Sequence, residues 1–210
     1  MLGKIVGALG QVAEAGGTIV GIRSGTEEPD FTVERKIGNV EIRRYGPRIA
    51  AETAIAADEE AARNEGFRRL ARYIFGGNQS KTKIAMTAPV AQQPSEKIAM
   101  TAPVASQRGP GGEWVIRFFM PSKYTLDSLP TPNEDVVRLV EVPGETVAVL
   151  RYSGLISAES TESHTRELLD TLRDNGIEPA GEPFSWFYDP PWTVPFLRRN
   201  EAAVVIDAGA

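Results

Sequence analysis

The sequence predicts an α+β fold: a curved antiparallel sheet (a distorted barrel) with two long helices, built from two β/α repeats related by a pseudo-two-fold axis. Short segments alternate apolar and polar side chains, as half-buried strands do. Two longer segments have the three- and four-residue apolar spacing of amphipathic helices. The order strand, strand, helix, strands occurs twice along the chain. Packing the helices on the sheet buries the apolar faces of both.

The first repeat contains predicted strands at 31–35, 40–45, 49–55 and 114–120. The turn Gly46-Pro47 is predicted to close a hairpin between the second and third strands. A helix at 58–75 follows, because Phe67, Leu70, Ala71 and Ile74 lie on one face of a helix. The acidic residues at 58–60 suit a helix amino terminus, and Gly76-Gly77 ends the helix. The strand at 114–120 is apolar on both faces except at Arg117, which is typical of a central strand.

The second repeat has the same order of elements. Its predicted strands are 136–142, 146–152, 184–188 and 202–206, and its helix is 158–175. Pro143-Gly144 is predicted to close a hairpin between the first two of these strands. Gly176 ends the helix, and a proline-rich stretch separates the last two strands.

The nine-residue sequence KIAMTAPVA occurs twice, at 83–91 and at 97–105. The five residues between the copies are a usual length for a hairpin loop. Pro89 and Pro103 cannot donate hydrogen bonds, so the pairing is irregular there. Side chains alternate between the two faces of a strand. If Ala91 pairs with Lys97, one apolar face of the hairpin therefore carries Ile84, Met86, Ile98 and Met100.

The doubled segment, with Phe75-Gly76-Gly77-Asn78 before it, resembles the signature of the SOUL/haem-binding protein family in its bacterial form. Further stretches fit in family order: FMPSKYTL at 119–126, LPTP at 129–132, YDPPW at 188–192 and LRRNE at 197–201. The resemblance covers 28–207. It implies binding of haem or another tetrapyrrole, and a fold like the effector-binding domains of bacterial transcription regulators. It also implies a haem groove near the end of the first helix and the methionine-containing loop that follows.

Three residues are candidate haem ligands or contacts. Met86 and Met100 carry thioethers, which bind haem iron or line apolar ligand surfaces, although core packing would also explain them. His164, the single histidine, borders the apolar face of the second helix. Its imidazole is a possible axial ligand, and the alternative is a histidine at the edge of the core.

Charged and aromatic groups form two further candidate sets. Arg68, Arg69 and Arg72 make a basic stripe on the first helix that suits haem propionates. Pairing with Glu65 on a solvated helix face is the alternative reading of this stripe. The second set either stacks on a porphyrin or covers one end of the sheet, and it consists of Trp186, Tyr188, Trp192 and Phe196.

The composition argues against several classes of function. The net charge of −5 is spread along the chain without a run of five like charges, which disfavours a nucleic-acid partner. With no cysteine, the chain has no thiolate ligand, no cysteine nucleophile and no covalent haem attachment motif. No nucleophile elbow or phosphate loop is present.

The leading hypothesis is therefore a non-covalent binding protein whose cofactor or cargo is haem, for transport, buffering or sensing. Two other classes stay open. One is an enzyme acting on a tetrapyrrole or other small apolar molecule, and the other is a protein-interaction module that uses the same groove.

We expect residues 1–27 to form an amphipathic helix and linker, followed by the haem-binding domain at 28–210. Leu2, Ile5, Leu9 and Val12 lie on one helix face, and Lys4, Gln11 and Glu14 interrupt the apolar run, so it is unsuited to crossing a membrane. If this helix is retained in the mature protein, we expect a cytoplasmic location. The alternative is a cleaved secretory signal with Ala13-Glu14-Ala15 as its cleavage pattern, and a periplasmic location.

The retained-helix prediction is tested by mass spectrometry of the protein purified from its native host. We expect the mature chain to include Leu2, Ile5, Leu9 and Val12. A mature chain that begins at Gly16 would show that the segment is a signal.

Overall fold

The computed structural model describes residues 26–80, 95–190 and 192–208. The predicted amino-terminal helix and the first copy of the doubled segment, with Met86, lie outside these described residues.

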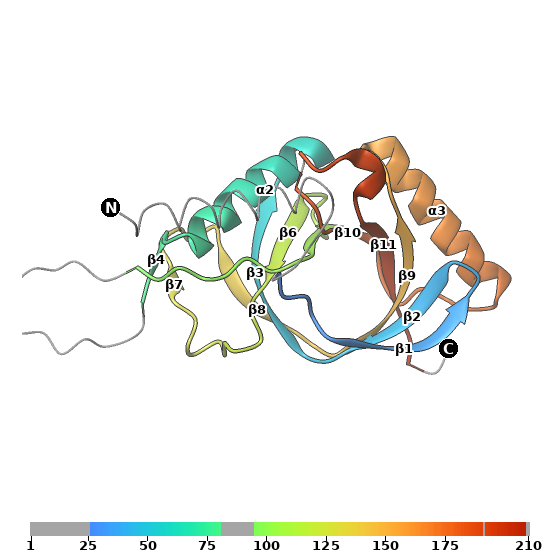
Figure 1. Cartoon of the computed structure of the whole chain (residues 1–210), viewed down its shortest axis with the longest axis horizontal. Coiled ribbons are helices and arrows are strands. Elements are labelled where there is room, and N and C mark those ends of the chain that lie inside the picture. Colours follow the sequence, from blue (N-terminus) through green and yellow to red (C-terminus); the bar gives the residue numbers. More distant parts are fainter. Residues whose placement is uncertain (1–25, 81–94, 191, 209–210) are drawn as a thin grey trace, which may run out of the picture.

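The main element is a strongly curled antiparallel sheet with the strand order β1-β2-β9-β11-β10-β5-β6-β3-β8 (Figure 1). In the first half of the chain its strands are β1 Phe31–Ile37, β2 Val40–Tyr45, β3 Arg48–Ile55, β5 Val104–Arg108 and β6 Trp114–Phe119. In the second half they are β8 Arg138–Val142, β9 Glu145–Tyr152, β10 Phe184–Phe187 and β11 Asn200–Ile206. The remaining elements are helices α2 Glu59–Ile74 and α3 Ala158–Asp174, the short pair β4 Asn78–Gln79 and β7 Thr131–Pro132, and the 3-10 turn Pro195–Leu197. The predicted α+β class, curved antiparallel sheet and two long helices are confirmed.

Both helices begin where a side chain caps them. The Asp58 carboxylate accepts a hydrogen bond from the backbone N–H of Ala61 at 2.9 Å, and the Ser157 hydroxyl accepts one from Ser160 N–H at 3.1 Å. These bonds satisfy amide groups that have no partner inside the helix. The local sequence thus determines where each helix starts.

The two predicted hairpins at Gly46-Pro47 and Pro143-Gly144 are wrong. Instead, β2 pairs with β9 and β3 pairs with β8. Tyr45 lies opposite Glu145, and Arg48 opposite Val142, so a single register runs through both turns. A two-residue hairpin needs residues with positive φ, and neither glycine of these turns has one. The chain therefore bends here without reversing, and two long bent strands pair with each other.

This pairing relates the two halves of the molecule. In the first half, β3, β6 and β5 are neighbours in the sheet, and α2 packs on β3 and β6. In the second half, β9, β11 and β10 are neighbours, and α3 packs on β9 and β11. The two halves meet again where β5 pairs with β10. This arrangement is the one expected for two β/α repeats related by a pseudo-two-fold axis.

The sheet has an outer face that carries the helices and an inner face that encloses a core of its own. Two clusters of buried side chains contain helix residues, for example Leu168 of α3 and Leu70 of α2. A third cluster contains residues of seven strands and none from a helix, including Tyr45, Phe119 and Trp186. Since these strands come from around the whole curl (Figure 1), the third cluster fills its interior.

The second copy of the doubled segment departs from the predicted hairpin. Residues 97–100 are not a strand, and β5 begins only at Val104. The backbone N–H of Ile98 donates to Ile74 O at 2.8 Å, which ties this stretch to the end of α2. Ile98 is buried and Met100 is 36% exposed, so the two side chains do not share one buried face. The alternation expected of a strand does not apply to an irregular segment.

The packing of α2 on the sheet depends on Gly66. A Cβ atom placed there would lie 2.4 Å from Cγ1 of the fully buried Ile116 on β6.

We expect Gly66→Ala to lower the free energy of unfolding by about 1–3 kcal/mol, because overpacking outweighs the better helix propensity of alanine. Gly181→Ala is the control, since nothing lies within 4 Å of its Cβ position, and its effect should stay within about 0.5 kcal/mol. Urea titrations of both variants measure this, and an unchanged or higher stability of Gly66→Ala would contradict the close packing.

Candidate functional site

The predicted basic stripe lies on α2, but its three arginines differ in exposure. The side chains of Arg68 and Arg72 are 70% and 64% exposed, whereas that of Arg69 is 27% exposed. Glu65 forms ion pairs with Arg68 at 2.8 Å and with Arg69 at 2.9 Å. Arg72 pairs with Glu134. Exposed ion pairs contribute little to stability, so Arg68 and Arg72 are available to a ligand at little cost.

Apolar side chains lie on the same helix and on the segment beside it. Phe67 and Phe75 are 37% and 59% exposed, and Phe67 makes an edge contact with Phe118 at a ring-centroid distance of 5.4 Å. Met100 follows Ile98, whose backbone is bound to the end of α2. We call the surface formed by these three exposed apolar residues and the two exposed arginines, namely Phe67, Arg68, Arg72, Phe75 and Met100, the α2 surface.

Asn78, the last residue of the Phe-Gly-Gly-Asn motif, links the end of α2 to the segment that begins at residue 95. Its amide nitrogen donates to Tyr73 O at 2.7 Å and to Glu96 O at 2.8 Å, and its amide oxygen accepts from Glu96 N–H at 2.9 Å. The side chain is buried. It therefore holds the start of the 95–100 segment against the end of the helix, which positions Met100 near α2.

His164 is not brought together with the α2 surface. It lies on α3, which packs on β9 and β11, whereas α2 packs on β3 and β6. Its Nδ1 lies 2.7 Å from Ser160 O and its ring stacks on Tyr152 at 3.9 Å. Because a carbonyl oxygen only accepts, Nδ1 carries a proton. These contacts account for a histidine at the edge of the core, the alternative that the sequence left open.

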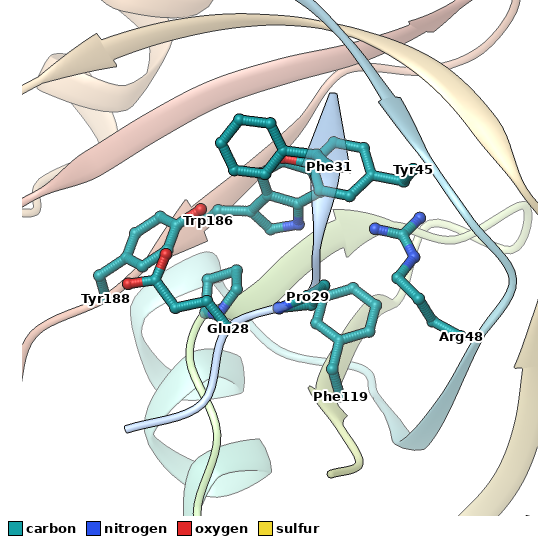
Figure 2. Close-up of a pocket in the computed structure, with 9 residues that line it drawn as sticks. Glu28, Pro29, Phe31, Tyr45, Arg48, Phe119, Trp186 and Tyr188 are labelled. Atoms are coloured by element: carbon teal, nitrogen blue, oxygen red, sulfur yellow. The ribbon is translucent and has the colours of Figure 1, made fainter. Parts of the chain in front are cut away.

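The interior of the curl holds a second set of polar and aromatic side chains (Figure 2), of which the sequence singled out only Trp186 and Tyr188. Trp186 and Tyr188 had been grouped with Trp192 and Phe196, yet the first two are buried in the interior and the others are 64% and 74% exposed. Trp186 makes ring contacts with Tyr45 at 5.3 Å and with Phe119 at 6.5 Å. A narrow cleft lies beneath residues 28–31, and a cavity of about 110 Å³ adjoins it; Phe119 and Trp186 line both.

A network of ion pairs is buried in the wall of this interior. Glu201 is fully buried, and its carboxylate accepts from Arg43 at 3.0 Å, from Arg199 at 3.0 Å and from the Tyr188 hydroxyl at 2.7 Å. Burial opposes the charge on Arg43, but the attraction of Glu201 outweighs it and raises the pKa of Arg43. Burial also raises the pKa of Tyr188 well above its usual value, so this hydroxyl stays protonated and donates. The carboxylate is thus fully used by its three partners.

Arg48 is the exception in this interior, because its donors are only partly used. Its side chain is 9% exposed, and it forms an ion pair with Glu145 through Nη2. Among the described residues, no group accepts from Arg48 Nε or Nη1, or from the buried Trp186 Nε1. The guanidinium lies 4.6 Å from the Tyr45 ring centroid and 4.9 Å from that of Phe119. Burial lowers the pKa of Arg48, and Glu145 only partly offsets this effect.

The comparison with known families assigns the chain. The family model described as SOUL heme-binding protein matches residues 26–205. The chain belongs to this family.

Curated relatives support the assignment. Heme-binding protein 2 of Homo sapiens is 33% identical over 142 residues, which are 66% of this chain and 64% of that protein. Heme-binding protein 2 of Mus musculus is 29% identical over 145 residues, 69% of this chain and 66% of that protein. Heme-binding protein 1 of Xenopus laevis is 27% identical over 158 residues. The chain thus spans just under two thirds of the length of the first two relatives.

Solved structures share the fold at low sequence identity. The EcmrR C-terminal domain has a TM-score of 0.58 and 10% identity, with 80% of this chain and 96% of that chain covered. A hydrolase from Listeria innocua has a TM-score of 0.54 and 8% identity, with 83% of this chain and 94% of that chain covered. At such identities these matches establish the common architecture alone.

The described residues show neither a membrane-spanning helix nor a cluster of metal ligands. They contain no helix that is long and apolar enough to cross a membrane. Nor do they contain a group of three or more histidine or acidic side chains placed to hold a metal ion.

We expect Glu201→Gln to lower the free energy of unfolding by about 3 kcal/mol or more, because it leaves buried Arg43 without its main counter-charge. Glu162→Gln is the control, since Glu162 is 75% exposed and pairs with Arg166 of the same helix; it should change stability by less than about 0.5 kcal/mol. Urea titration of both variants at pH 7 measures the difference. Equal stabilities would show that the buried network is not a structural requirement.

Proposed function

We propose that this protein binds haem non-covalently and reversibly, for transport, buffering or sensing. The observation that carries the proposal is membership of the SOUL heme-binding protein family across residues 26–205. The relatives named heme-binding protein 1 and 2 support the same ligand.

The size of the interior argues for a site on the outside of the sheet. The interior cavity has a volume of about 110 Å³, whereas pockets for drug-sized ligands have volumes of roughly 300–1,000 Å³. A haem would therefore have to displace the packed ring of Trp186, which is 2% exposed. Helix α2 lies on the outer face of the sheet (Figure 1), and the α2 surface offers apolar and basic groups without such rearrangement.

The α2 surface suits the two chemical parts of haem. Phe67, Phe75 and Met100 offer apolar contact to the flat ring. Arg68 and Arg72, one helical turn apart and exposed, suit the propionates. Arg69 is a weaker candidate because its guanidinium is turned toward Glu65 and, at 3.5 Å, the Thr53 hydroxyl. Met86 stays a proposed contact from the segment that joins β4 to residue 95.

Iron ligation by His164 is not required by this proposal. Burying apolar area contributes roughly 25 cal/mol per Å², so one face of a haem supplies several kcal/mol without an iron bond. The cost of association consumes part of this gain, which points to micromolar affinity. An open site of that strength releases its ligand readily, as transport or buffering demands.

We expect hemin to give a saturable one-to-one change in the Soret band with the wild-type protein. His164→Ala should keep most of the affinity. The double variant Arg68→Glu, Arg72→Glu should weaken binding about tenfold or more, because two favourable charges become repulsive. Arg166→Glu is the matched control, since Arg166 is 66% exposed on α3 and pairs with Glu162 of the same helix; its titration should match that of the wild type.

Each contrary result has a definite meaning. Loss of the Soret change in His164→Ala would replace this proposal with axial ligation by histidine. Equal affinities of the double variant and Arg166→Glu would move haem away from the α2 surface. No saturable change in the wild type would reject haem as the ligand. A cytoplasmic setting for this function is a prediction of the sequence, and the mass spectrometry described above tests it.

A further inference from the structure

The interior of the curl has the chemistry of a second binding site, one that faces away from the α2 surface. Successive residues of β6 show the separation: Phe118 packs in the cluster that contains α2, and Phe119 packs in the interior cluster. A ligand inside the curl therefore contacts none of the residues of the α2 surface, and the inference does not depend on the proposed function.

The interior presents donors that the described protein groups do not use. Arg48 Nε and Nη1 and Trp186 Nε1 are buried without an acceptor among the described residues. A buried donor without a partner costs about 1–3 kcal/mol, and buried polar groups in proteins are nearly always paired. Three such donors on two neighbouring side chains therefore indicate an acceptor that the described residues do not supply. Both side chains line the same cleft (Figure 2).

The surroundings of these donors are aromatic. The rings of Phe31, Tyr45, Phe119 and Tyr188 line the cleft together with Trp186. The adjoining cavity of about 110 Å³ is lined by the same Phe119 and Trp186. Since one water molecule needs at least about 10–15 Å³ measured in this way, the cavity accommodates a group of several non-hydrogen atoms. An apolar wall with a few converging polar groups is the usual form of a small-molecule site.

We propose that the interior binds a small aromatic monocarboxylate, with its oxygens accepting from Arg48 and Trp186 and its ring in the adjoining cavity against Phe119, Phe184 and Trp186. A carboxylate is the acceptor that suits a guanidinium best. The cover of the cleft is the 28–31 segment, which is fastened by the ion pair of Glu28 with Arg199 at 2.9 Å. Because the cleft has no room for a water molecule, a carboxylate reaches Arg48 there only when this segment moves.

The acidic groups nearby set the strength of binding. Glu28 is neutralised by Arg199, and the carboxylate of Glu201 is used by Arg43, Arg199 and Tyr188. Glu145, which pairs with Arg48 through one nitrogen and lines the cavity, is the remaining competitor. A bound carboxylate shares Arg48 with Glu145, and the negative charge of Glu145 weakens its binding. Removing the charge on Glu145 therefore strengthens the site, an effect opposite in sign to that of removing Arg48.

The test uses benzoate and follows the indole N–H resonance of Trp186 in ¹H–¹⁵N NMR spectra, assigned by its loss in Trp186→Phe. We expect a saturable shift of this signal with a dissociation constant of about 0.1–1 mM, the range for a ligand of a few atoms. Benzamide, neutral and of the same shape, should bind at least about tenfold more weakly because it lacks the charge-assisted contact. Glu145→Gln should bind benzoate about five- to tenfold more tightly.

Variants at Arg48 complete the test. Arg48→Met should abolish the saturable shift. If this variant fails to fold, the double variant Arg48→Met, Glu145→Gln replaces it, because exchanging both members of a buried ion pair is tolerated better than removing one. Arg44→Met is the control: its side chain is 54% exposed and pairs with Glu34, so binding should not change.

Three results would overturn the proposal. Benzamide binding as well as benzoate would show that the site does not select an anion. Benzoate affinity unchanged by the loss of Arg48 would show that another group binds it. No saturable shift of Trp186 in the wild type or in Glu145→Gln would show that water alone satisfies these donors.

Discussion

The architecture depends on the pairing of two long bent strands around the pseudo-two-fold axis. The β2–β3 strand and the β8–β9 strand keep one register through Gly46-Pro47 and Pro143-Gly144. In the sheet order, β2 and β9 lie near one end, and β3 and β8 lie at the other. Because β2 runs into β3, and β8 into β9, the two long strands join the two ends of the sheet. This constraint makes the sheet curl, gives it an interior, and leaves the outer face for the helices.

The interior is consequently a place where charged groups are buried and must find partners across the two halves. Arg43 on β2 meets Glu201 on β11. Arg48 and Glu145 are the first residues of β3 and β9, which are equivalent positions of the two repeats, and they pair with each other. The symmetry of the two repeats thus brings these two equivalent positions together, and they carry opposite charges in Arg48 and Glu145. Buried pairs of this kind are costly to break and contribute to stability only when their geometry is good.

The two faces of one sheet also separate two kinds of chemistry. The outer face, with α2 and the 95–100 segment, has exposed phenylalanine, methionine and arginine side chains that suit a large flat ligand. The inner face has a small aromatic cavity, and donors without an acceptor in the described part of the chain, which suit a small ligand. Side-chain alternation along a strand is enough to keep them apart, as the neighbours Phe118 and Phe119 show.

Local patterns in the sequence determined the elements and the family, because their causes are local. Capping by Asp58 and Ser157, helical spacing and strand alternation act within a few residues, so both helices and the main strands were predicted almost to their ends. The order of elements showed the repeat, and the motifs indicated the family. The positions of Arg68, Arg69 and Arg72 on α2 could be predicted because a helix face is defined by spacing alone, whereas their role as a haem site stays a prediction.

Only the tertiary structure decided which strands pair and which side chains meet. Gly46-Pro47 and Pro143-Gly144 look like hairpin turns, and the partner of each strand lies about a hundred residues away, with Tyr45 opposite Glu145. The irregular path of 97–100 follows from Asn78 and the end of α2, which no alternation pattern encodes. Arg48 and Trp186 are 138 positions apart in the sequence (186 − 48) and become neighbours only inside the curl. Contacts over such separations depend on the closure of the whole sheet, and for that reason the sequence did not show that Arg48 meets Trp186.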